Sequence, residues 1–121
     1  MDDYQYDCAS AELDELAHVI TDLFPEQTRF SDPPSDDGTP SLVIHWIAMR
    51  FGATARRMTF TVRFEKEAFA RYRAEPPRVR GRGFAVLRAY VEATLGSLEE
   101  QYAEGQTVPR EVEIVLGDEF A

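Results

Sequence analysis

The sequence predicts an α+β fold: an antiparallel sheet of three to four strands with helices packed on one face, in the order α-β-β-β-α-α-β. In residues 57–64 apolar side chains alternate strictly with polar ones, which is the pattern of a strand with one buried face. Residues 11–24 and 84–104 instead carry apolar side chains at intervals of three and four, as amphipathic helices do. Short connections favour placing such helices on one face of an antiparallel sheet.

The best-defined unit is a hairpin over residues 41–65, SLVIHWIAMRFGATARRMTFTVRFE, with its turn at 51–54. Its first strand is apolar on both faces. Facing residues of a hairpin lie on the same side of the sheet, so one face should mix apolar side chains of the first strand with arginines and threonines of the second. A face that meets only water should be more uniformly polar. We therefore expect something to cover this outer face.

The first forty residues hold one helix and little else. Residues 1–9 are expected to be frayed or partly ordered. Ser10 is a good N-cap for a helix over 11–24, which Pro25 ends because proline cannot continue it. Residues 27–31 form a short strand, and the Pro- and Asp-rich residues 31–40 form a mobile loop.

Two helices and a strand follow the hairpin. A short helix over 66–75 stops at Pro76, and 78–83 form a basic, flexible connector. The long helix 84–104 ends before Gly105, which suits a left-handed C-terminal cap, and Gly96 within it predicts close packing against a neighbour. Residues 111–116 alternate as a last strand, which Pro109 places at an edge.

Length and composition indicate one soluble domain. The chain has 121 residues, 44% of them apolar, and one cysteine, Cys8. A lone cysteine suits a reducing compartment, the acidic N-terminal residues do not read as a signal peptide, and no run approaches the ~20 apolar residues of a membrane span. We expect a cytoplasmic location.

The net charge of −9 is strongly segregated along the chain. Residues 1–40 have a balance of −10, residues 41–90 of +8, and residues 91–121 of −7. We expect the basic middle to be neutralised by the acidic flanks, with the acids of the last strand facing the arginines of the hairpin. The overall acidity disfavours binding to nucleic acid or anionic lipid.

No catalytic or metal-binding signature is present. Cys8, His18 and His45 have no spacing that links a nucleophile to a base or builds a zinc site. We expect no cofactor, and a small enzyme of unknown class remains only an alternative.

The basic run RVRGRGFA gives a second alternative, an anion or nucleic-acid site at the start of the long helix. Its binding residues would be Arg78, Arg80, Arg82 and Arg88.

Three resemblances bear on the fold. The leading α-β-β-β-α order resembles the double-stranded-RNA-binding domain, without its lysine-rich motif. The small acidic chain also resembles secretion chaperones, which implies a dimer that cradles a partner peptide. Over residues 12–104, the runs HWIAMRF and RFEKEAFARYR resemble small proteobacterial proteins of unknown function, which implies no activity.

The preferred hypothesis is a non-enzymatic protein-interaction or adaptor domain, acting as a homodimer or with another protein through the outer face of the hairpin. Its aromatic, Met and Arg content is typical of interfaces. His45 in an apolar, Arg-flanked setting would make assembly pH-sensitive. The expected contact residues are Val43, His45, Ile47, Met49, Arg57 and Arg63.

Overall fold

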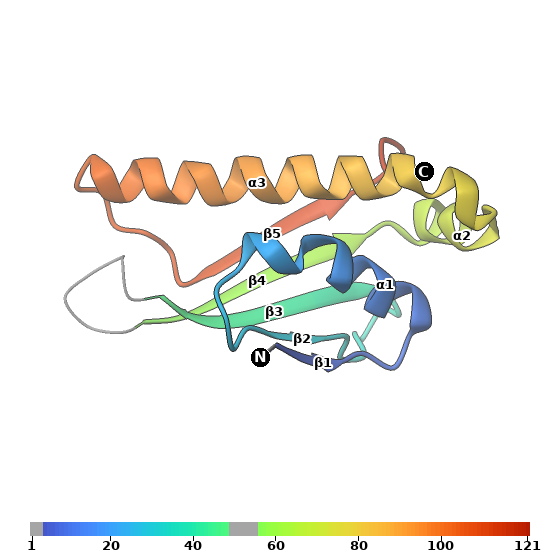
Figure 1. Ribbon diagram of the computed structural model, residues 1–121, viewed down its shortest axis with the longest axis horizontal. Helices are drawn as coiled ribbons and strands as arrows, with labels where there is room; N and C mark the ends of the chain where they lie inside the picture. The colour runs from blue at the N-terminus through green and yellow to red at the C-terminus, as the bar shows by residue number, and fades with distance from the viewer. Residues whose placement is uncertain (1–3, 49–55) are drawn as a thin grey trace.

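The computed structural model describes residues 4–48 and 56–121, which form an α+β fold with a mixed sheet. Figure 1 shows the arrangement, with the helices together on one side of the sheet. In chain order the elements are β1 (Gln5–Asp7), α1 (Ala11–Ile20), the 3-10 helix η1 (Thr21–Leu23), β2 (Arg29–Ser31), β3 (Ser41–Ala48), β4 (Arg56–Phe64), α2 (Lys66–Ala74), the 3-10 helix η2 (Pro77–Val79), α3 (Gly81–Ala103) and β5 (Glu111–Leu116).

The five described strands lie in the order β1-β2-β3-β4-β5. The central pairs β2–β3 and β3–β4 are antiparallel as predicted, but the outer pairs β1–β2 and β4–β5 are parallel. The prediction of a purely antiparallel sheet of three to four strands is therefore only partly right. The reason is the helical connections: α1 returns the chain to the same end of the sheet between β1 and β2, and α2 with α3 does so between β4 and β5, and such crossovers produce parallel neighbours.

Residues 5–7 form β1, a strand that the sequence did not predict within the segment expected to be frayed or partly ordered. The backbone N–H of Gln5 donates to the carbonyl of Thr28 (3.1 Å). The ring of Tyr6 stacks on that of Phe30, with centroids 5.3 Å apart. These contacts add β1 to the edge of the sheet beside β2.

The first helix begins as predicted and ends earlier. Ser10 caps α1, with its Oγ accepting a hydrogen bond from the N–H of Leu13 (3.3 Å). The α-helix ends at Ile20, and a 3-10 turn leads to Phe24, which is extended. An extended residue before Pro25 is what the proline ring demands.

The long helix begins earlier than predicted, because α3 starts at Gly81 and η2 precedes it, so the expected connector 78–83 is largely helical. Gly83 is buried against Phe120 and Tyr72. The prediction of close packing at Gly96 is wrong, since a Cβ built there would meet nothing within 4 Å. The left-handed cap at Gly105 is confirmed by its φ of 78°.

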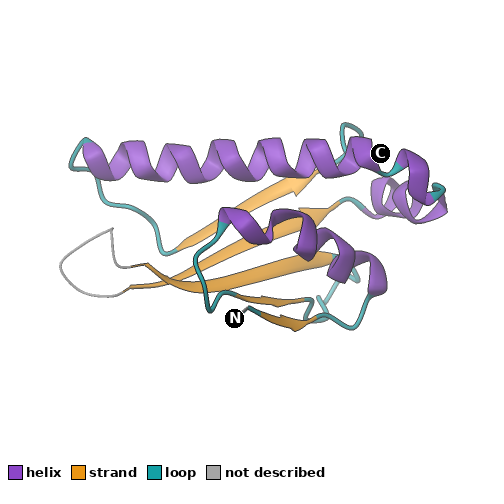
Figure 2. Cartoon of the chain, in the orientation of Figure 1, coloured by secondary structure: helices purple, strands orange, loops and turns teal. Residues whose placement is uncertain are grey.

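The core lies between the helices and the inner face of the sheet, as Figure 2 makes plain. The even positions of β3 and β4 point into it, which confirms the alternation seen in the sequence. Aromatic rings meet at its centre, where Phe24 packs edge-on against Trp46 and Phe60. The predicted turn at 51–54 lies outside the described residues. β5 occupies an edge of the sheet, as Pro109 suggested.

Candidate functional site

The odd positions of the hairpin share the face of the sheet opposite the helices, called here the outer face. Within the described residues no helix lies over it (Figure 1). The strand register places on it Gln5, Asp7, Arg29, Ser31, Ser41, Val43, His45, Ile47, Arg57, Thr59, Thr61, Arg63, Glu111, Glu113 and Val115.

The structure gathers the described members of the predicted contact set on this face. Ile47 is 52% exposed and lies directly opposite Arg57. Val43 is half-buried and His45 is exposed. Arg63 lies at the far end of the face from Ile47. Met49 lies outside the described residues.

Ion pairs link each edge strand of the sheet to its neighbour on the outer face. The Nε of Arg29 donates to Asp7 (2.8 Å), which joins β2 to β1. An Nη of Arg63 lies 3.5 Å from Glu113, which joins β4 to β5 diagonally, because the residue directly opposite Glu113 is Thr61. Both pairs are largely exposed, so their net stabilisation is small.

Sequence reasoning missed the outer members of the face. Row by row, His45 lies between Arg29 on β2 and Thr59 on β4, and Thr59 in turn faces Glu111 on β5. Such rows depend on the register between strands far apart in the chain, which no local pattern reveals. The segregation of charge did predict that acids would come from the flanks, but not which ones.

His45 is held in its row by a contact between its Nδ1 and the Oγ1 of Thr59 (3.1 Å). Partial burial lowers the pKa of His45 below its usual value, and the positive charge of Arg29 lowers it further. The imidazole is therefore neutral at neutral pH, and acidification adds a charge beside an arginine.

A hollow of about 540 Å³ opens at the end of the outer face that carries Ile47 and Arg57. Its described lining combines two arginines, a histidine, two glutamines and a threonine with apolar side chains, and it includes no carboxylate. The lining residues are Gln5, Gln27, Arg29, His45, Trp46, Ile47, Arg57, Met58 and Thr59.

The basic residues of the alternative anion site lie apart from this face, and two of the four are used internally. Arg88 binds Asp22 through two contacts (2.7 and 3.2 Å) and donates to the carbonyl of Val19 (2.8 Å), which ties α3 to α1. Arg78 and Arg82 are exposed and make no ion pair with a described residue.

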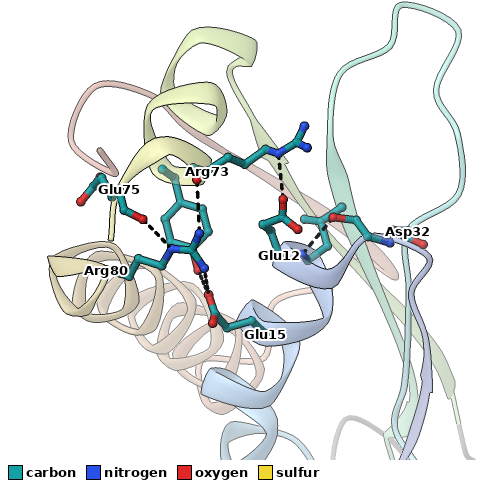
Figure 3. Close-up of polar contacts among 9 residues, drawn as sticks. Glu12, Glu15, Asp32, Arg73, Glu75 and Arg80 are labelled. Atoms are coloured by element: carbon teal, nitrogen blue, oxygen red, sulfur yellow. Dashed lines mark hydrogen bonds and ion pairs between the residues drawn. The ribbon is translucent and has the colours of Figure 1, made fainter. Parts of the chain in front are cut away.

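Arg80 is the most enclosed of the four, with its side chain 17% exposed. Figure 3 shows it between α1 and α2, where it contacts Glu15 (3.1 Å) and donates to the carbonyls of Arg73 and Glu75 (3.3 Å each). Its guanidinium also lies over the ring of Tyr72, 5.0 Å from the centroid. The hydrogen-bond donors of Arg80 are thus used by the protein itself, and none of these bonds brings the four arginines together.

A polar cluster around this arginine fastens the two short helices together. The hydroxyl of Tyr72 donates to Glu15, and Arg73 pairs with Glu12 at 2.8 Å (Figure 3). Burial and the hydrogen bond to Glu15 raise the pKa of Tyr72. The carboxylate of Asp32 accepts hydrogen bonds from the N–H groups that precede α1 (2.8 Å each). The cluster is fully explained as a link between elements.

The residues weighed for catalysis do not come together. His18 stacks on Tyr6 (centroids 3.9 Å apart) and contacts the carbonyl of Asp14, whereas His45 lies on the outer face. Burial and nearby acids, Asp32 foremost, raise the pKa of Cys8 to about 12, so the thiol is a poor nucleophile. No group of three or more potential metal ligands occurs in the described parts of the chain.

None of the helices that the structure describes has both the length and the apolar character needed to cross a bilayer. Over residues 13–117 the chain matches the family described as "Protein of unknown function (DUF3022)". Neither a curated protein nor a solved structure matches it.

Proposed function

The chain belongs to the DUF3022 family of proteins of unknown function, and for it we propose a non-enzymatic role as a protein-interaction domain that forms a homodimer through the outer face. The observation that best supports this proposal is that apolar side chains are exposed on a sheet face that no described helix covers. Ile47 is 52% exposed and Val115 is 50% exposed, and both belong to this face. The two side chains lie at opposite ends of the face, Ile47 opposite Arg57 and Val115 opposite Arg63, so each would offer a separate apolar contact to a partner.

The charge of the face favours a second copy of this chain as the occupant. Its ionised side chains are three arginines and three acids, so it is close to neutral although the whole protein carries −9. A second copy presents the same balanced set, and two neutral faces approach without the repulsion that two acidic surfaces would meet. The charged residues are Asp7, Arg29, Arg57, Arg63, Glu111 and Glu113.

The strands of the face are unequal in length: β3 and β4 have eight and nine residues, but β1 and β2 have three each. At about 3.3 Å per residue and about 4.8 Å per strand, the flat projection of the five strands is about 460 Å². An interface of the standard size, roughly 800 Å² per partner, would therefore include surface around the sheet as well. Two such faces would pack as the sheets of a sandwich do.

The test is the mass in solution of the wild type and of Ile47→Glu at micromolar concentration. We expect a dimer for the wild type and a monomer for Ile47→Glu, because the apolar contact is lost and burying the new carboxylate, even opposite Arg57, carries a desolvation cost. Val79→Glu is the matched control: Val79 is also exposed (39%) but lies on η2, away from the outer face, and its variant should stay dimeric. A monomeric wild type would overturn the proposed homodimer.

The single Cys8 fits a reducing compartment, and we propose the cytoplasm as the place where the dimer acts.

A further inference from the structure

The hollow lies at the end of the outer face that carries Ile47 and Arg57. Two guanidiniums, those of Arg29 and Arg57, line it, and its described lining has no acid. Asp7, outside this lining, pairs with Arg29 (2.8 Å), so in a chain of net charge −9 the described acids leave the charge of Arg57 unpaired. Concave walls strengthen such a local potential, which attracts anions.

The two arginines keep hydrogen-bonding capacity for a ligand. Arg57 forms no ion pair with any residue in the described ranges. The Nε of Arg29 donates a hydrogen bond to Asp7 (2.8 Å), and the Arg29 side chain is 57% exposed. A guanidinium has five N–H donors in a planar fork that matches the two oxygens of a carboxylate. Arg29 lies on β2 and Arg57 on β4, and β3 runs between these two strands.

The other lining residues indicate the chemical character of the rest of the ligand. Ile47 lines the hollow with half its surface exposed, whereas Trp46 and Met58, which also border it, direct their side chains into the core on the other side of the sheet. The amide side chains of Gln5 and Gln27 add neutral donors and acceptors at the rim. Gln27 is held at a φ of 69°, a left-handed conformation that costs a non-glycine residue about 1 kcal/mol or more. A strained backbone at the rim of a hollow is common at ligand sites.

We propose that this hollow binds a small organic carboxylate, with the carboxylate held by Arg57 and Arg29 and its apolar group lying against Ile47. The volume of about 540 Å³ is within the usual range for small-molecule sites. The exposed aliphatic side chain of Ile47 favours a monoanion with a hydrocarbon body over a compact, strongly hydrated dianion such as phosphate. This inference rests on the proposed dimer leaving the hollow open to solvent, because both use Ile47.

Trp46 gives a direct readout, since it is the one tryptophan of the chain and lines the hollow. Hexanoate is titrated into the full-length protein while its fluorescence is followed, with hexanamide as the neutral probe of matched shape. We expect saturable binding of hexanoate and binding of hexanamide that is at least about tenfold weaker, because a charge-assisted hydrogen bond is lost.

Variants of equal charge change separate the hollow from the rest of the face. Arg57→Gln should weaken hexanoate binding by about tenfold or more. Arg63→Gln, on the same strand and face but outside the hollow, should leave it unchanged. Equal binding of the acid and the amide, or equal affinity in Arg57→Gln and the wild type, would overturn the proposal. The mass of each variant, measured with and without hexanoate, separates loss of the ligand from loss of the dimer.

Discussion

Tyr72 on α2 donates a hydrogen bond to the carboxylate of Glu15 on α1, across 57 residues of sequence. The ring of Tyr72 is fully buried and its hydroxyl finds its partner at the edge of the core. The same carboxylate receives Arg80, so one side chain of α1 holds both α2 and the start of α3. This link is structural, so removing the hydroxyl oxygen of Tyr72 should have a measurable effect on the free energy of unfolding.

Tyr72→Phe should therefore lower the free energy of unfolding by about 1–2 kcal/mol, because a hydrogen bond to a charged group is lost while the ring stays in place. Chemical denaturation measures this. Tyr90→Phe, which removes the same oxygen from a 41% exposed side chain on α3, should change the stability by much less. Equal effects of the two substitutions would show that the contact between Tyr72 and Glu15 contributes nothing.

Substitutions of Arg80 and Arg78 should differ in their effect on stability, because Arg80 bonds to other parts of the protein and Arg78 is exposed. Arg80→Gln loses its contacts with Glu15 and with two backbone carbonyls, so a loss of about 1–2 kcal/mol is expected. Arg78→Gln should leave stability within about 0.5 kcal/mol of the wild type, because Arg78 is exposed.

The same pair tests the alternative anion site. If the run at 78–88 served nucleic acid, both variants would reduce retention on immobilised nucleic acid at low salt. We expect the wild type not to be retained at all, since Arg80 and Arg88 are paired with Glu15 and Asp22. Salt-dependent retention of the wild type that both substitutions weaken would contradict this.

Local periodicity was enough to predict the hairpin, the helices and the edge strand, because each buries one face over many residues. It missed β1, since three residues are too few to show alternation. It also missed the parallel pairing, which is set by the helical crossovers and not by the strands themselves. Gly81 and Gly83 have low helix propensity, so the first turn of α3 was read as a connector although tertiary packing keeps it helical.

The candidate site was predicted only in part for a related reason. Ile47 and Arg57 lie opposite each other in one hairpin, so their common face follows from local pattern. Arg29 and Glu111 join that face through strands far away in the sequence. The hollow depends on Arg29 and Arg57 together, and it becomes visible only once the order of the strands is known.

Two glycines of α3 should respond to alanine in opposite directions. Gly96 faces open space, so Gly96→Ala should stabilise the protein by about 1 kcal/mol through helix propensity alone. At Gly83 a Cβ would lie 3.1 Å from the ring of Phe120 and 3.2 Å from its carbonyl oxygen. Overpacking of this kind costs about 1–3 kcal/mol, so Gly83→Ala should be less stable than the wild type. Thermal unfolding of both variants checks this, and a Gly83→Ala protein as stable as Gly96→Ala would refute the tight contact.

His45 should make stability depend on pH in a defined direction. Its pKa in the folded protein is lower than the usual 6.5, so unfolding takes up a proton once the pH falls through that range. The free energy of unfolding should therefore decrease as the pH falls from about 7 to about 5, and the dimer should weaken in the same window because the new charge lies beside Arg29. His45→Gln removes the titrating group and should flatten this dependence. The matched control is His18→Gln, which changes the histidine of α1. This variant should retain the pH dependence of the wild type. Parallel pH profiles for the wild type and His45→Gln, in both unfolding and dimer dissociation, would exclude His45 as the source.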